Sequence, residues 1–180
     1  MNGVLCFSGG IASGKTTLSA AVAERLGMRR GSFGGFVRQT AQERGVEDTR
    51  ESLQSLGETL IAEMGWDGFC AAVLHAAGWT PGSTLVLDGI RHTSAFETVR
   101  KYVAPMTTVL VFVDVERDVR QARADSAKAA DLAKADTHST EQDVHNGALR
   151  KMATVVLDGT KGVDALVEDV LRAVSERRTL

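Results

Sequence analysis

The sequence has few cysteines, little net charge and no long apolar run, and each of these shortages excludes a class of protein. Its two cysteines, Cys6 and Cys70, cannot form a disulfide framework and lack metal-ligand spacing. The sequence has 21 Lys and Arg residues and 23 Asp and Glu residues. Because these charges nearly cancel, no overall electrostatic field favours binding to nucleic acid or to an anionic membrane. No apolar run approaches membrane-spanning length, and no export signal precedes the first apolar run. We therefore expect a cytoplasmic protein with both cysteines in its core.

The most informative stretch is residues 9–16, which fits the phosphate-binding pattern G-x-x-x-x-G-K-[ST]. An apolar run at 4–7 predicts a buried strand before it, and the helical spacing of apolar residues at 18–26 predicts a helix after it. Such a loop turns its backbone N–H groups inward and binds phosphate with the help of the helix dipole. The alternative is a glycine-rich turn that binds no ligand. In that case the strand, the octet and the helix would have to occur together by chance. The expected nucleotide-binding residues are Gly9, Gly10, Ile11, Ala12, Ser13, Gly14, Lys15, Thr16 and Thr17.

Two residues of this loop have side chains suited to a nucleotide triphosphate. Lys15 can reach the β- and γ-phosphates, and the Thr16 hydroxyl is placed to bind a Mg²⁺ ion that bridges them. The loop therefore predicts ATP and Mg²⁺ as cofactors.

Apolar runs and segments of helical spacing alternate along the 180 residues, of which 43% are hydrophobic. The expected strands are 4–7, 32–37, 84–88, 107–113 and 153–157. The expected helices are 15–26, 38–44, 49–64, 69–77, 94–103, 139–151 and a last one after 162. This alternation is typical of an α/β fold with a parallel sheet and helices on both faces.

Charged residues follow two of the expected strands. The run 84–87 ends in Asp88-Gly89-Ile90-Arg91, which brings a carboxylate to the sheet edge where the phosphate loop also lies. After the strand at 107–113, Arg117, Arg120 and Arg123 recur every third residue and share one helix face. They can converge on an anion, although a solvated charged face explains such a pattern equally well.

These motifs resemble the P-loop kinases of small molecules, the nucleoside monophosphate kinase-like group that includes dephospho-CoA kinase. The resemblance rests on residues 9–16 and 88–91, on the arginines at 117–123, where such kinases carry a mobile lid, and on residues 153–166. It implies one P-loop kinase domain over residues 1–180, with a three-layer fold, a five-stranded parallel sheet and a helical lid inserted at about 116–140.

Two shorter patterns point to a narrower relationship. Arg50-x-x-x-Gln54-x-x-Gly57 and His138-x-x-Glu141 look similar to those of bacterial and phage deoxynucleotide kinase-like ATPases.

The resemblance also implies a role for each candidate residue in moving the ATP γ-phosphoryl group to a bound acceptor. Lys15, Asp88, Arg120 and Arg123 would be catalytic, and Asp88 would hold the metal through water or act as a base. Arg91 would clamp an anionic group of the acceptor. Arg38 and Arg50 would contact the acceptor too, although either can equally be a solvated helix arginine. The residues expected to contact adenine are Gly159, Thr160 and Lys161.

A (deoxy)nucleoside monophosphate is the favoured acceptor, and the alternatives are a hydroxymethylated base in DNA, dephospho-CoA, or no acceptor in a nucleotide-binding switch. Residues 32–37 have no acid where dephospho-CoA kinases carry an Asp, which argues against dephospho-CoA. Asp158 stands where an Asn is common, and no Asn-Lys-x-Asp motif supports a GTPase. We expect a small-molecule substrate and no membrane partner, and the sequence does not indicate an oligomeric state.

Overall fold

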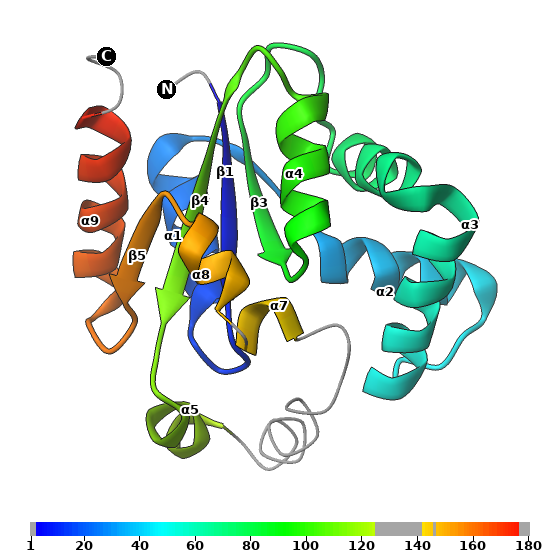
Figure 1. The fold of residues 1–180 in the computed structure, drawn as a ribbon, viewed down its shortest axis with the longest axis horizontal. Helices are drawn as coiled ribbons and strands as arrows, with labels where there is room; N and C mark the ends of the chain where they lie inside the picture. The colour runs from blue at the N-terminus through cyan, green and yellow to red at the C-terminus, as the bar shows by residue number, and fades with distance from the viewer. Residues whose placement is uncertain (1–2, 125–141, 146, 177–180) are drawn as a thin grey trace.

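The apolar runs of the sequence form the centre of a parallel sheet. The computed structural model describes residues 3–124, 142–145 and 147–176. In this part of the chain, five parallel strands pair in the order β2-β3-β1-β4-β5 (Figure 1). They are β1 (Gly3–Gly9), β2 (Arg29–Ser32), β3 (Leu85–Ile90), β4 (Thr107–Asp114) and β5 (Val155–Asp158). The predicted α/β fold with a five-stranded parallel sheet is therefore confirmed.

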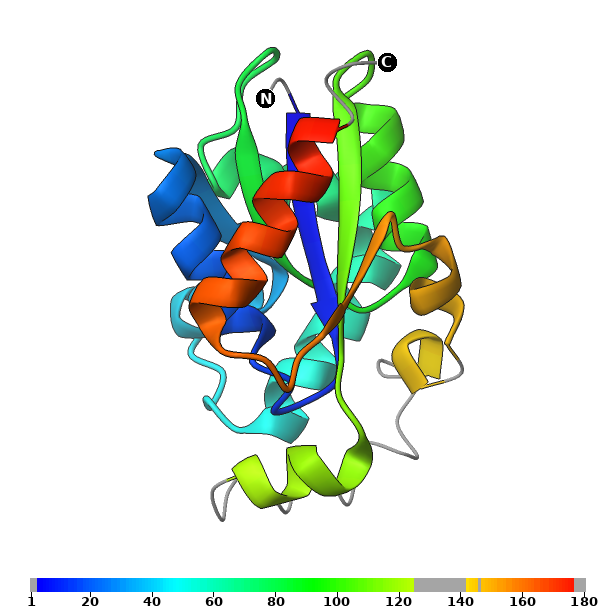
Figure 2. The ribbon, with the colours of Figure 1, turned by 90° about the vertical axis from the view of Figure 1, so that its left-hand side faces the viewer.

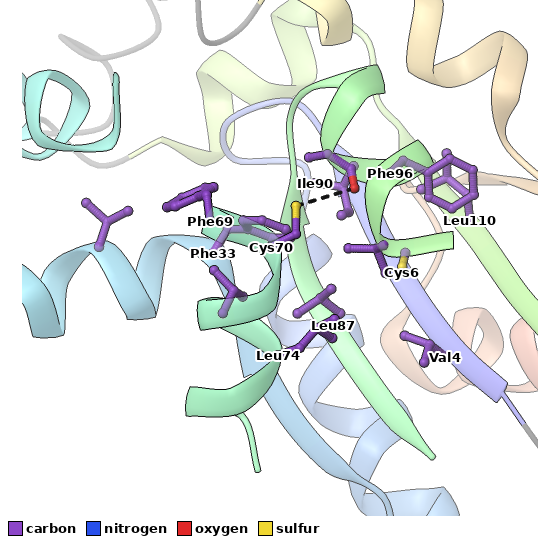
Figure 3. Packing of buried hydrophobic residues seen from close by; sticks show 14 of the residues in the cluster. Val4, Cys6, Phe33, Phe69, Cys70, Leu74, Leu87, Ile90, Phe96 and Leu110 are labelled. Carbon is purple, nitrogen blue, oxygen red and sulfur yellow. Dashed lines mark hydrogen bonds between the residues drawn. The ribbon is translucent and has the colours of Figure 1, made fainter. Parts of the chain in front are cut away.

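Helices cover both faces of the sheet, because alternate residues of each central strand point to opposite sides. Their bounds are α1 (Lys15–Leu26), α2 (Phe33–Arg44), α3 (Arg50–Ala76), α4 (Thr93–Tyr102), α5 (Arg117–Arg123), α7 (Gln142–His145), α8 (Ala148–Met152) and α9 (Val163–Glu176). Leu5 and Phe7 pack with α1 and α9, which lie in front of the sheet in Figure 2. Val4 and Cys6 pack with α2, α3, α4 and α8 on the other face, as Figure 3 shows in part.

The expected second strand at 32–37 is wrong. The strand is β2, at residues 29–32, and α2 begins at Phe33 and includes the expected helix at 38–44. Ser32 ends the strand and caps the helix, because its Oγ accepts a hydrogen bond from the Gly35 N–H at 3.1 Å. Sequence reasoning missed β2 because it is an edge strand with the charged residues Arg29 and Arg30 at its start, as edge strands often have.

Two glycines shape the remaining helices. Gly65, with φ 66° and ψ 173°, kinks α3 at the expected break between its two halves. A single helix was expected at 139–151, and this prediction is wrong for the residues that the structure describes. The segment forms two helices, α7 and α8, and Gly147 between them has φ 74°. A left-handed glycine ends a helix at low steric cost. The expected capping turn at 136–141 lies outside the described residues.

Both cysteines lie in the core, as expected. Cys6 and Cys70 are free thiols with no exposed surface, and the Cys70 Sγ–H donates to the Ala95 carbonyl at 3.8 Å (Figure 3). Burial raises the pKa of the Cys70 thiol from 9.0 to about 12 and raises the pKa of Cys6 as well. No helix in the described residues is long and apolar enough to cross a membrane.

The buried thiols predict a loss of stability in alkali. The folded state keeps protons that the unfolded chain releases above pH 9, so their contribution is complete below that pH and falls as pH rises. Each thiol should lower the free energy of unfolding by about 1.4 kcal/mol per pH unit. Urea unfolding at pH 9 to 11 should therefore give a shallower pH slope for Cys70→Ala than for the wild type. Equal slopes would show that Cys70 ionises normally in the folded protein.

Candidate active site

The loop between β1 and α1 has the backbone shape that anion binding requires. Gly9, Ala12 and Gly14 have φ values of 144°, 58° and 85°, and the Ser13 N–H closes the turn on the Gly10 carbonyl at 3.2 Å. A Cβ on Gly9 would lie 2.6 Å from the Val113 carbonyl oxygen, so glycine is required there. No side chain caps α1 at Gly14, which leaves the N–H groups of its first turn available to phosphate oxygens.

The loop and the first turn of α1 carry four polar side chains, those of Ser13, Lys15, Thr16 and Thr17. The Lys15 Nζ donates to the Gly10 carbonyl at 3.4 Å and so lies over the loop. Thr16 and Thr17 are exposed in the first turn of α1. The Ser13 Oγ is buried and has no hydrogen-bond partner among the described residues, so it can bind an incoming oxygen.

Asp88 lies at the end of β3, beside Phe7 of β1, with 4% of its side chain exposed. Its Oδ2 accepts a hydrogen bond from the Arg30 Nη2 at 2.7 Å. Its Oδ1 is buried and has no hydrogen-bond partner within the described residues. Magnesium is usually bound by one or two carboxylates together with substrate phosphates, so a bare carboxylate oxygen at this edge fits the ion. Arg30 was missed by sequence reasoning, because it lies on the strand that the sequence did not predict.

The helix α5, which carries Arg117, Arg120 and Arg123, lies beyond the carboxyl ends of the strands (Figure 1). The Arg120 Nη1 donates to the Ile11 carbonyl at 3.4 Å, and a Cβ on Gly10 would lie 2.7 Å from this nitrogen. The Arg123 Nη1 donates to the Gly159 carbonyl at 2.8 Å. Arg120 therefore lies against the phosphate loop and Arg123 against the loop after β5. Most of the expected lid, with His138 and Glu141, lies outside the described residues.

The loop after β5 is tightly packed at its first residue. A Cβ on Gly159 would lie 2.4 Å from the Val115 Cγ2. The Thr160 N–H and Oγ1 bind the Asp158 Oδ1 at 3.0 and 2.6 Å, and these bonds lower the pKa of Asp158. The Lys161 Nζ is paired with Asp169 of α9 at 2.8 Å. Of the three residues expected to contact adenine, Gly159 is therefore bonded to Arg123, whereas the Lys161 ammonium group is paired with Asp169 on α9.

A cavity of about 380 Å³ lies between α2, α3 and the end of β3. Three residues predicted to bind the acceptor, Arg38, Arg50 and Arg91, line it together. Arg38 also forms an ion pair with Asp48, another lining residue, at 3.0 Å. The structure therefore gathers into one cavity three arginines that are far apart in the sequence.

The cavity also has an aromatic wall, which sequence reasoning missed. Phe33, Trp66 and Phe69 line it, with ring centroids 5.7 Å apart for Phe33 and Phe69 and 6.3 Å apart for Trp66 and Phe69. The ring of His92 lies 5.0 Å from that of Trp66. The sequence placed Trp66 in a break between helices, and no spacing pattern indicated that the kink at Gly65 puts its ring in a cavity wall.

The strands that lead into the phosphate loop and to the cavity are joined where they end. The Ser8 Oγ, just before the loop, donates to the Ile90 carbonyl at 2.7 Å, and both residues are buried. Ser8 pairs with Ile90 while Phe7 pairs with Asp88, so Gly89 is bulged, with φ 87°. A bulge redirects the side chains that follow it. It accounts for Ile90 packing in the core cluster of α3 and α4, on the opposite face of the sheet from Asp88, although the two residues are an even number apart.

Comparison with known proteins gives a family match over most of the chain. A family model described as an AAA domain matches residues 5–142. A UPF0200 protein from Aeropyrum pernix is 34% identical over 89 residues, which are 49% of this chain and 46% of that protein. Another from Methanothrix thermoacetophila is 29% identical over 136 residues, 73% of each chain. The chain therefore matches less than half the length of the first of these relatives.

Solved structures of small-molecule kinases have the same fold. Shikimate kinase from Aquifex aeolicus superimposes with a TM-score of 0.64 at 14% identity, covering 97% of this chain and 98% of the kinase. A gluconokinase from Sinorhizobium meliloti gives a TM-score of 0.61 at 16% identity, covering 97% and 93% of the two chains. These similarities extend to the whole sheet and its helices and concern the fold alone.

Proposed function

The chain belongs to the family of AAA domains, and on that premise we propose that it is an ATP-dependent kinase whose acceptor is a (deoxy)nucleoside monophosphate. The observation that carries the proposal is that the phosphate loop and the arginine-lined cavity lie next to the ends of two paired strands, β1 and β3. The bond from Ser8 to Ile90 joins these strand ends, with the loop following Ser8 and the cavity residue Arg91 following Ile90. A nucleotide-binding switch needs only the loop, whereas a kinase also needs the cavity to hold its acceptor.

The phosphate loop supports the donor half of the reaction. Phosphoryl transfer depends mainly on positioning and on neutralising charge over the transferred oxygens. Lys15 would hold the β- and γ-phosphates, and Arg120, which lies against Gly10, would add a second positive charge at the loop. Thr16 and Asp88 would hold Mg²⁺. A Mg²⁺ ion held there would supply positive charge that offsets the negative charge on the transferred phosphate oxygens.

The cavity supports the acceptor half. Its volume lies within the range of about 300–1,000 Å³ that is usual for small-molecule sites. Arg91, Arg38 and Arg50 suit a phosphate, because planar guanidinium groups bind its oxygens in pairs. The wall of Phe33, Trp66 and Phe69 suits a planar base. This wall favours a nucleotide over shikimate or gluconate, for which the two similar kinases are named.

We expect a deoxynucleoside monophosphate to raise ATP consumption at least about tenfold over background hydrolysis, since the acceptor would replace water at the γ-phosphoryl group. The assay compares nucleoside monophosphates, nucleosides, dephospho-CoA, shikimate, gluconate and hydroxymethylated DNA at equal enzyme concentration. If hydroxymethylated DNA were the only compound that raised ATP consumption, the acceptor would be a base in DNA and not a nucleoside monophosphate. If no compound raised turnover, the protein would not be a kinase of this class, and a nucleotide-binding switch would take its place.

A further inference from the structure

A chain of three hydrogen bonds connects Asp88 to the first turn of α1. The Asp88 Oδ2 accepts from the Arg30 Nη2 at 2.7 Å, and the Arg30 Nε donates to the Ser19 Oγ at 3.0 Å. The Ser19 hydroxyl in turn donates to the Thr16 carbonyl at 3.0 Å. Arg30 therefore lies between the two residues that the proposed function assigns to Mg²⁺, Asp88 and Thr16.

The network lies largely away from solvent. Ser19 is fully buried, and the exposed fractions of the Asp88 and Arg30 side chains are 4% and 30%. A charged group that is buried without a counter-charge is costly. The Arg30 guanidinium supplies that counter-charge from an edge strand and occupies only one carboxylate oxygen, so the bare Oδ1 is available to the ion.

Strand alternation explains why Arg30, and not its neighbour, makes these contacts. Arg30 pairs with Val86, which lies two residues before Asp88, so the two side chains share the sheet face that α1 covers. Arg29 lies on the opposite face, where its Nη1 donates to the Gly78 carbonyl at 3.0 Å. The chain thus offers a matched pair of arginines on one strand, of which one contacts the network.

We propose that Arg30 is a positioning residue for the magnesium–nucleotide site, which fixes Asp88 relative to the first turn of α1. The inference rests on the proposed function, because it takes Asp88 and Thr16 as the residues that hold Mg²⁺. A guanidinium can make both contacts at once, since its Nε and Nη2 donate in fixed directions from one plane. Residues that orient metal ligands typically change metal affinity or activity by about 10- to 100-fold when replaced.

The test measures ATP binding by calorimetry with Mg²⁺ and with EDTA, so that the effect of the ion is separated from that of the loop. In the wild type, Mg²⁺ should tighten ATP binding. In Arg30→Met the dissociation constant with Mg²⁺ should rise about 10-fold or more while the constant in EDTA stays unchanged. Arg29→Met should bind ATP as the wild type does in both conditions.

A second variant makes the test independent of the stability of Arg30→Met. Ser19→Ala keeps the Arg30–Asp88 ion pair and removes the acceptor on α1, and the substitution suits a helix interior. It should retain the wild-type melting temperature and lose part of the Mg²⁺-dependent tightening. If folded Arg30→Met and Ser19→Ala both keep the full Mg²⁺ effect, Arg30 has no positioning role. If the wild type itself shows no Mg²⁺ effect, the proposed function fails instead.

Discussion

Replacing Lys15 with alanine is expected to lower kcat for phosphoryl transfer by about 10²- to 10³-fold, the usual cost of removing a group that stabilises developing charge. The Lys15 Nζ lies over the phosphate loop, 3.4 Å from the Gly10 carbonyl oxygen, and the residue is only partly buried. Its loss would therefore remove the positive charge proposed for the β- and γ-phosphates without opening a cavity in the core. The melting temperature should stay close to that of the wild type.

The matched control is Lys101→Ala, which removes an exposed lysine from the last turn of α4. The first turn of α4 follows the cavity residues Arg91 and His92, so Lys101 lies at the other end of the helix, and this variant should keep full activity. Steady-state rates for both variants with the best acceptor give the comparison. A Lys15→Ala enzyme with more than a tenth of the wild-type kcat would show that the loop does not act on the transferred phosphoryl group.

The Arg91→Ala substitution is expected to raise the KM for the acceptor by about 10- to 100-fold, since a hydrogen bond to a charged group contributes about 1.5–3 kcal/mol. The KM for ATP should change little, because Arg91 lines the cavity and is not one of the loop residues proposed to bind ATP. Initial rates measured across acceptor and ATP concentrations separate the two constants.

Arg100→Ala is the control for this experiment. Arg100 is exposed in the last turn of α4, the helix that follows Arg91, so its removal changes the net charge equally without touching the cavity. If the KM for the acceptor were unchanged in Arg91→Ala, Arg91 would not bind the acceptor. An equal rise in both KM values would instead indicate a general distortion of the sheet edge.

The features that sequence reasoning predicted well are local ones. The phosphate loop depends on an octet of consecutive residues, and the central strands β1, β3 and β4 are continuous apolar runs, so short stretches of sequence determine both. The carboxylate at Asp88 was predicted at the correct sheet edge because it directly follows one of these runs.

The features that were missed depend on contacts between distant parts of the chain. Arg30 and Asp88 are 58 residues apart and meet only because β2 pairs with β3. The aromatic wall depends on the kink at Gly65, which directs Trp66 to a cavity that α2 and β3 complete. An edge strand with charged residues lacks the apolar run by which strands are recognised, so β2 was placed several residues too late.

The fate of the γ-phosphoryl group tests the central claim most directly, because the proposed donor and acceptor sites act together only if the group passes between them. The enzyme is incubated with γ-labelled ATP, Mg²⁺ and a mixture of deoxynucleoside monophosphates, and the products are separated by chromatography. We predict that the label appears in a deoxynucleoside diphosphate, with ADP formed in equal amount. Release of all the label as inorganic phosphate, at a rate that no acceptor changes, would contradict the account.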